Sequence, residues 1–487
     1  MSKIKLGESK LSSFISGSLI LVLSNVCLKA INFFLLPLYT ANLTPTMIGI
    51  SDSITALTGI ILPLLTMGLD SAFSAFYFDK NDYERSKKVF STLTWAFLVS
   101  GSIPLLLMIV TPSISRLLFH TEDYSYIVKF ALVSISFNLW YLPFSLEIRL
   151  QNKMLLYGIS NVVASVSMVA LNILFVSFMH LGESSLVLST MIVHIESFLI
   201  LLLFVRSKPK RKWFDKGLLL QMLKYAVPLV PMTLMVWILS LSDRYVILYY
   251  HGEAEVGLYG IGLRFTNLMN VVISAISMAY TTFAFSSKED TDARQHYYYI
   301  FNIEAILLIG IAFTIGLFGK EIIKVMTTEE YGQSYLALRD LMFSQVFFAM
   351  TTIIGYGIFF EKKSVYSLIA VSAGAGLNFS LNMLLIPRFG ISAAAFTTLL
   401  GYILYFFLTL CFSEKLYPCN YGQRKVLISL FILYGACCFC MELTIWIKMI
   451  TWIICFVGMI VAYKDILKKL KGFAVAFLLR EKKNNNS

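Results

Sequence analysis

Apolar residues occur in long runs along almost the whole chain, and short polar segments separate these runs. Each run has about 18 residues or more, which is enough to cross a hydrocarbon layer of ~30 Å as a helix. The sequence lacks the alternating segments of about ten residues that a transmembrane barrel requires. The pattern therefore predicts an all-α, polytopic membrane protein.

We predict about fourteen transmembrane helices. The 487-residue chain is 58% hydrophobic and 14% charged, whereas a soluble protein of this length carries about 25% charged residues. No cleavage pattern follows the first span, so we expect this span to be retained. The predicted ranges are 14–39, 46–69, 89–111, 126–148, 154–178, 185–205, 220–250, 255–284, 296–318, 336–360, 364–386, 390–412, 426–446 and 448–463, and the last is short.

Basic residues lie mainly in every second connection between these spans. Because cytoplasmic loops are enriched in lysine and arginine, the alternation predicts that both termini face the cytoplasm across a cell membrane. The net charge of +12 is then a consequence of topology, and we expect no nucleic-acid partner. The seven cysteines follow neither a disulfide framework nor a zinc motif, so no metal site is expected.

Similar features recur in the two halves of the chain at an almost constant separation. Since six spans separate the two sets, the pattern predicts two six-helix lobes related by an axis along the membrane normal. The predicted units are an N-terminal lobe (1–216) ending in the basic linker RSKPKRKWFDK, a second lobe (217–419), and a C-terminal part (420–487) with two helices and a basic tail. The recurring pairs are Gly49 and Gly257, Gly182 and Gly390, and Thr190 and Thr398 at 208 residues, and Asn172 and Asn382 at 210.

Three basic residues, Lys29, Arg244 and Arg264, lie inside predicted spans and away from the span ends. A base near the middle of a transmembrane helix costs about 3 kcal/mol or more unless it faces protein or water. The three residues therefore indicate a cationic internal cavity that binds substrate. The alternatives are a structural ion pair for Lys29 and extension of the Arg244 side chain to the membrane surface.

Acidic residues in the spans are candidates to balance these charges or to couple transport to an ion. Asp243 and Arg244 are adjacent on a helix and point about 100° apart, so each needs a partner from another helix. We expect Asp243 to pair with Lys29 or Arg264, which leaves a net positive charge suited to phosphate. The candidate set is Asp52, Asp243, Glu196 and Glu304, and the last two could instead be paired structurally.

Two prolines, Pro228 and Pro231, interrupt the seventh predicted span. Proline removes a backbone donor and breaks the helical hydrogen-bond ladder. The pair is a candidate hinge, and a static bend is the alternative reading.

The sequence resembles the polysaccharide transport branch, the Wzx-type flippases of O-antigen or capsule repeat units, within the multidrug/oligosaccharidyl-lipid/polysaccharide exporter superfamily. The resemblance is carried by PLYTANLTPTMIGISDSI (37–54), MGLDSAFSAFYFDKND (67–82) and KYAVPLVPMTLMVWILSLSDRYVILYYHGEAEVGLYGIGLRF (224–265). It implies two lobes in a V and alternating access, and it implies a non-enzymatic protein without a cofactor. The implied cargo is a polyprenyl-diphosphate-linked oligosaccharide that moves from the inner to the outer leaflet.

The same resemblance implies coupling to a gradient of H⁺ or Na⁺, as in an antiporter, and contact with membrane lipids and polysaccharide polymerase or chain-length proteins. A multidrug exporter of the superfamily is an alternative, although its cation site should be acidic and aromatic. A peptidoglycan-precursor flippase should carry more cavity bases than Lys29, Arg244 and Arg264. A membrane-embedded polymerase or ligase should show a large outer loop or a catalytic cluster, and the sequence shows neither.

Overall fold

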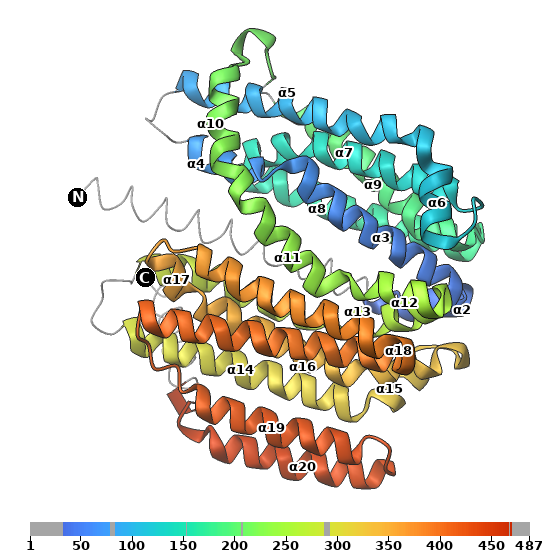
Figure 1. Ribbon diagram of the computed structural model, residues 1–487, viewed down its shortest axis with the longest axis vertical. Helices are drawn as coiled ribbons and strands as arrows, with labels where there is room; N and C mark the ends of the chain where they lie inside the picture. Colours follow the sequence, from blue (N-terminus) through green and yellow to red (C-terminus); the bar gives the residue numbers. More distant parts are fainter. Residues whose placement is uncertain are drawn as a thin grey trace, which may run out of the picture.

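A computed structural model describes residues 33–77, 83–151, 153–205, 208–286, 293–466 and 468–469. Helices and short connections make up this part of the chain, and no strand occurs in it (Figure 1). Twelve of its helices are long and apolar enough to cross a membrane. The prediction of an all-α polytopic membrane protein is confirmed.

The observed helices correspond closely to the predicted spans. One helix, α18, contains the two predicted ranges 364–386 and 390–412 and breaks at Gly390, where φ is 56° and ψ is −137°. The short fourteenth span is present as α20 (Ile445–Ala462). Of the first predicted span only the last residues are described, in α2 (Leu36–Asn42), and the tail from residue 470 also lies outside the described residues.

The helices form two bundles, drawn one above the other in Figure 1. We call α2–α9 the first bundle. Its further members are α3 (Pro45–Thr66), α4 (Leu69–Tyr77), α5 (Tyr83–Leu107), α6 (Thr111–Phe119), α7 (Ser125–Leu150), α8 (Met154–Ile173) and α9 (Ser185–Phe204). The second bundle comprises α12 (Asp243–His251), α13 (Glu253–Ser286), α14 (Ala293–Leu317), α15 (Gly319–Met326), α16 (Tyr335–Ile354), α17 (Tyr356–Phe360) and α18 (Val365–Leu416).

The bundles meet where α3 crosses α13. A Cβ atom on Gly49 would lie 1.7 Å from the carbonyl oxygen of Glu253, and one on Gly257 would lie 1.9 Å from that of Pro45. Only glycine allows two helix backbones to approach this closely, as in other small-residue helix crossings in membranes. The two glycines therefore fix the distance between the bundles.

This crossing is reciprocal. Shifting the contact between Gly49 and Glu253 by 208 residues gives the contact between Gly257 and Pro45. A second pair of glycines at this separation also matches in conformation: Gly182 and Gly390 both have positive φ, at 59° and 56°. Residues separated by 208 positions thus occupy matching places in the two bundles, as a duplicated unit would produce.

Two hydrogen bonds between the bundles lie at the end that we predict to face outward. The hydroxyl of Tyr331 donates to the carbonyl oxygen of Leu43 at 2.7 Å, and Thr328 donates to that of Thr40 at 3.1 Å. Tyr331 is fully buried. The connection before α16 therefore holds the end of α2 in this conformation.

The predicted seventh span is divided between the bundles. Its first part, α10 (Lys216–Ala226), packs on α4 and α5, whereas α11 (Val230–Leu241) and α12 pack on α18. A 3-10 turn at Val227–Leu229, which contains Pro228, separates the two parts, and the chain crosses diagonally between the bundles in Figure 1. The change of bundle thus falls inside the span and not at the predicted boundary of 216 and 217, because proline interrupts the ladder there.

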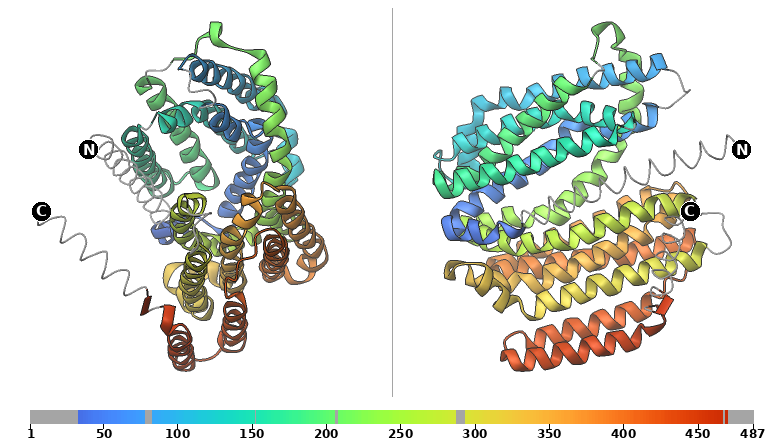
Figure 2. Two further views of the ribbon diagram at one scale, coloured as in Figure 1. Left: turned by 90° about the vertical axis from the view of Figure 1, so that its left-hand side faces the viewer. Right: turned by 180° about the vertical axis from the view of Figure 1, so that it is seen from behind.

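The last two helices, α19 (Gln423–Cys440) and α20, form a hairpin beside the second bundle (Figure 2). Lys448, which is 1% exposed, pairs with Glu321 of α15 at 2.7 Å. The hydroxyl of Tyr434 donates to Asp340 of α16 at 2.8 Å. Polar contacts therefore attach the hairpin to the second bundle.

The crossing yields a prediction for the substitution Gly49→Ala. The added methyl group would overlap the carbonyl group of Glu253, and overpacking of this kind costs about 1–3 kcal/mol. We expect a lower midpoint of thermal unfolding for the detergent-purified protein. Gly376→Ala is the control because no atom lies within 4 Å of that Cβ position, and equal midpoints for the two variants would contradict the assigned role of Gly49.

Candidate functional site

A pocket of about 510 Å³ lies between the two bundles. Its walls come from α2, α3, α8 and α9 of the first bundle, from α11, and from α12, α13, α16 and α18 of the second. The lining is largely polar but mostly uncharged. Its polar residues include Ser51, Asp52, Thr55, Asn172, Thr190, Ser240, Arg244, Arg264, Asn267, Asn270 and Gln345. We call this space the central pocket.

Arg264 of α13 pairs with Asp52 of α3 across the central pocket, with 3.4 Å between Nη2 and Oδ1. The guanidinium of Arg264 also lies over the ring of Tyr39, 5.7 Å from its centroid. Asp52 can approach α13 because residue 260 is a glycine, where a Cβ atom would be 1.9 Å from the carboxylate. Both predicted residues therefore belong to the pocket and join the bundles.

Arg244 of α12 also lines the central pocket, together with Ser240 one turn earlier. Its Nε and Nη1 atoms are buried and have no hydrogen-bond partner among the described residues. Trp237 of α11 lines a separate apolar cavity. Buried guanidinium nitrogens without hydrogen-bond partners carry a desolvation cost that a bound anion would offset.

The expected pairing of Asp243 with Arg264 is wrong, and Lys29, the other expected partner, lies outside the described residues. Asp243 is 1% exposed and accepts hydrogen bonds from the hydroxyl of Tyr259, from Thr398 at 3.3 Å, and from the backbone N–H of Arg244 at 2.9 Å. It faces the interior of the second bundle, between α13 and α18, while Arg264 turns toward Asp52. The helical offset between adjacent residues separates Asp243 from the pocket that Arg244 lines.

A hydrogen-bonded network extends from Asp243 into α18. Asn378 donates to Thr398 at 3.2 Å, Asn382 donates to Asn378 at 3.2 Å, and Thr397 donates to Asn382. All four of these α18 residues are buried. We call them, with Asp243 and Tyr259, the Asp243 cluster.

The Asp243 cluster offers one carboxylate with amide and hydroxyl oxygens, which suits a hard monovalent cation or a proton. The described residues contain no group of three or more His, Cys, Asp or Glu side chains that could hold a metal ion. Sequence reasoning missed the network in α18, although two asparagines four residues apart in an apolar helix, followed by Thr397 and Thr398, were a usable signal.

The other predicted residues lie away from the central pocket or outside the described part of the chain. Glu196 accepts a hydrogen bond from Ser167 at 2.9 Å, between α9 and α8. Glu304 lies on α14 and is 1% exposed. Pro228 lies in the 3-10 turn before α11, and Pro231 is in the first turn of that helix. Lys29 lies outside the described residues.

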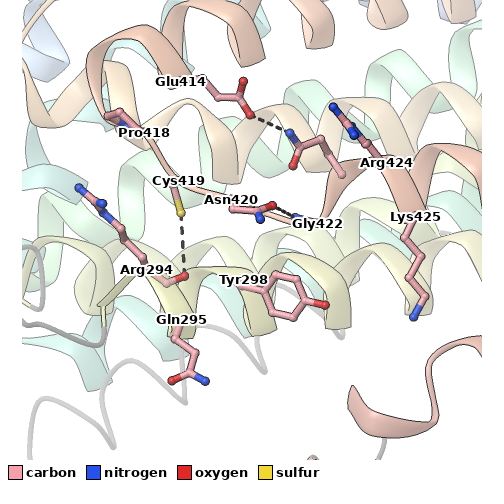
Figure 3. Close-up of a pocket in the computed structure, with 11 residues that line it drawn as sticks. Arg294, Gln295, Tyr298, Glu414, Pro418, Cys419, Asn420, Gly422, Arg424 and Lys425 are labelled. Carbon is pink, nitrogen blue, oxygen red and sulfur yellow. Dashed lines mark hydrogen bonds between the residues drawn. The ribbon is translucent and has the colours of Figure 1, made fainter.

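A larger cavity of about 1120 Å³ lies at the end predicted to face the cytoplasm (Figure 3). It is formed by the start of α14, the end of α18 and the start of α19, so its walls come from one side of the molecule. Lys425 donates to the carbonyl oxygen of Ala462, and Glu414 accepts from Gln423 at 2.7 Å. None of the predicted site residues lines it, so the central pocket is the candidate site.

The fold is shared with solved structures of transporters. The chain aligns with a structure titled "Lipid II flippase MurJ, inward closed conformation" at a TM-score of 0.71 and 16% identity, over 93% of this chain and 100% of that one. An inward-facing multidrug resistance MATE family transporter of the MOP superfamily aligns at 0.62 and 15% identity, over 81% and 97%. The fold is thus that of the multidrug/oligosaccharidyl-lipid/polysaccharide exporter superfamily.

A family model described as "Polysaccharide biosynthesis protein" matches residues 43–336, and the chain belongs to this family. An uncharacterised membrane protein of Methanocaldococcus jannaschii is 27% identical over 135 residues. That match covers 27% of this chain and about a quarter, 26%, of the relative. The predicted membership of a polysaccharide branch of this superfamily is confirmed.

The Asp243 cluster yields a stability prediction for Tyr259→Phe. The substitution removes one donor to a buried carboxylate, and a hydrogen bond to a charged group is worth about 1.5–3 kcal/mol. We expect a clear fall in the thermal midpoint. Tyr405→Phe is the control, because the hydroxyl of Tyr405 makes no hydrogen bond within the described part of the chain. The same midpoint for both variants would argue against a structural role for the Tyr259 hydroxyl.

Proposed function

We propose that the protein is a flippase that moves a polyprenyl-diphosphate-linked oligosaccharide from the inner to the outer leaflet for surface polysaccharide assembly. The observation that carries this proposal is Arg244, which lines the central pocket and whose Nε and Nη1 atoms are buried without a hydrogen-bond partner among the described residues. Membership of the polysaccharide biosynthesis family supplies the glycan context. The lining residues explain how such a cargo would bind.

The charge of the central pocket suits a lipid diphosphate. Arg244 and Arg264 line it with one acid, Asp52, which leaves one net positive charge. Guanidinium groups bind phosphate oxygens through paired hydrogen bonds. A diphosphate would satisfy Arg244 and would compete with Asp52 for Arg264, so binding would weaken a contact between the bundles. Lys29 is proposed as a third base of the same site.

The proposed transport cycle is alternating access. In the described conformation the contacts of Tyr331 and Thr328 with α2 join the bundles at the predicted outer end. Loss of these contacts, with bending of the seventh span at Pro228 and Pro231, would open the central pocket to the other leaflet. The termini would remain in the cytoplasm throughout. Polymerase and chain-length proteins are the proposed acceptors of the flipped lipid.

The Asp243 cluster is proposed as the ion-coupling site, with H⁺ or Na⁺ as the ion. The cluster connects α12 and α13 to α18, so a change in the charge of Asp243 would alter the packing of helices that also carry Arg244 and Arg264. Asp52 is proposed to balance Arg264 until the cargo binds. Glu196 and Glu304 are weaker candidates, since neither lines the central pocket.

A lipid II flippase is the second candidate, because the MurJ structure covers 93% of this chain. The uncharged side chains of the central pocket favour a neutral glycan, and its two arginines are fewer bases than we expect of a peptidoglycan-precursor flippase. A multidrug exporter fits less well, since two of the three charged residues that line the pocket are bases.

The first functional prediction concerns Arg244→Gln and Arg264→Gln in vesicles that contain the purified protein. A fluorescent polyprenyl-diphosphate oligosaccharide is placed in one leaflet and its appearance in the other is timed. Each substitution removes charge-assisted hydrogen bonds, so we expect transfer to slow by about tenfold or more.

The matched control is Arg116→Gln, because Arg116 is exposed and pairs with Glu122 away from the pocket. Lipid II and a cationic dye are tested in parallel. Transfer of the oligosaccharide lipid that is insensitive to both substitutions would contradict the proposed site. Export of the dye without transfer of either lipid would support the multidrug alternative.

The second functional prediction concerns Asp243→Asn. The amide keeps the size of the side chain but cannot carry the negative charge, so we expect transfer that no longer responds to an imposed gradient. Transfer is measured with a Na⁺ gradient, with a pH gradient and with neither. A response of the variant equal to that of the wild type under both gradients would exclude Asp243 as the coupling residue.

A further inference from the structure

The Asp243 cluster has counterparts in the first bundle that are built differently. The constant separations of 208 residues, and of 210 around Asn172 and Asn382, identify these counterparts. The buried Leu35 corresponds to Asp243, so the described part of the first bundle has no carboxylate at this place. The positions that correspond to Asp243, Tyr259, Asn378, Asn382, Thr397 and Thr398 are Leu35, Ser51, Met168, Asn172, Ser189 and Thr190.

The two sets of residues differ in what they face. Ser51, Met168, Asn172 and Thr190 of the first bundle line the central pocket. The six residues of the Asp243 cluster are all buried, and none of them is among the residues that line this pocket. The same structural positions therefore surround a carboxylate in the second bundle, whereas in the first bundle four of them line the central pocket, although Ser51 and Asn172 are only 2% and 3% exposed.

The polar residues at these positions of the first bundle, Ser51, Asn172 and Thr190, present hydrogen-bond acceptors to the central pocket. The hydroxyl of Ser51 donates to the carbonyl oxygen of Glu183 at 2.7 Å, and that of Thr190 donates to Leu186 at 2.8 Å. With its proton used in this way, each oxygen can still accept. Asn172 donates through Nδ2 to the hydroxyl of Tyr39 at 2.8 Å, and its Oδ1 has no partner among the described residues.

Acceptors of this kind discriminate between the two parts of a glycolipid head group. A phosphate oxygen is an acceptor only and gains nothing from another acceptor, whereas a sugar hydroxyl can donate to it. On the opposite wall of the central pocket, Arg244 and Arg264 are donors only. The two arginines of the second bundle thus offer donors to the pocket, while Ser51, Asn172 and Thr190 of the first bundle offer acceptors.

We infer that Ser51, Asn172 and Thr190 form a sugar-binding subsite that selects uncharged, hydroxyl-bearing sugars next to the diphosphate. This inference rests on the proposed function, because it takes the arginine wall as the diphosphate site. A substrate bound in this way contacts both bundles at once. The subsite makes the glycan, and not only the diphosphate, a determinant of binding.

The inference is tested by binding to the purified full-length protein. The probes are farnesyl diphosphate and farnesyl diphosphate linked to glucose, galactose, rhamnose or N-acetylglucosamine. We expect the wild type to bind at least one sugar-bearing probe more tightly than farnesyl diphosphate. In Asn172→Leu that preference should fall by about tenfold, because the acceptor oxygen is lost while the branched shape of the side chain is kept.

Two further variants complete the test. Thr190→Val should reduce the same preference and remains informative if Asn172→Leu does not fold. Asn161→Leu is the matched control, since Asn161 lies on the same helix, α8, but does not line the central pocket. We expect this control to bind every probe as the wild type does.

The outcomes separate the two claims. If no sugar-bearing probe binds the wild type more tightly than farnesyl diphosphate, or if folded Asn172→Leu and Thr190→Val keep the preference, the subsite is overturned and the diphosphate site stands. An equal loss of affinity for all probes would also overturn the subsite. Failure of farnesyl diphosphate and of all its sugar derivatives to bind the wild type would overturn the proposed function as well.

Discussion

The contact between α3 and α13 at Gly49 and Gly257 sets the geometry of the central pocket. Since each glycine lies against a backbone carbonyl group of the other helix, the two axes cannot separate or slide without losing that fit. One turn farther along α3, Asp52 lies over Gly260 of α13. One more turn along α13, Arg264 reaches back to Asp52. The ion pair therefore follows from the crossing.

The reciprocal contacts give the two bundles a shared framework, but their polar residues have diverged. In the second bundle the carboxylate of Asp243 is enclosed by hydroxyl and amide groups. In the first bundle Leu35 takes its place, and Asn172 and Thr190 contribute to the pocket wall. One framework thus supports an enclosed carboxylate in the second bundle and part of the pocket wall in the first. In the proposed function this division keeps the cargo and the coupling ion in separate places.

Much of the fold could be predicted from the sequence, because spans are long apolar runs and the glycine pairs recur at 208 residues. Arg264 and Asp52 could be assigned to one cavity because charged residues inside spans must find polar surroundings. The partner of Asp243 could not be derived, since depth in the membrane does not specify which neighbour a helix face meets. The network from Asn378 to Thr397 was missed because neutral polar residues carry little signal in a membrane span.

The position at which the chain passes from the first bundle to the second also could not be predicted from the sequence. Composition predicted that this change occurs in the basic linker. In the structure, however, the backbone N–H of Asp215 donates to Thr92 of α5, and the following helix, α10, packs on the first bundle. Only packing shows that the seventh span belongs to both bundles.

The most direct test of the central claim is a distance measurement between the bundles at the predicted outer end. Spin labels are placed at residues 123 and 324, which are exposed as Asp123 and Lys324, in a chain without its seven native cysteines. The distance distribution is recorded in lipid vesicles with and without a polyprenyl-diphosphate oligosaccharide. Motion about the α3–α13 crossing predicts a second, longer distance when the lipid is added. A single distribution that the lipid leaves unchanged, in protein that binds it, would contradict the account.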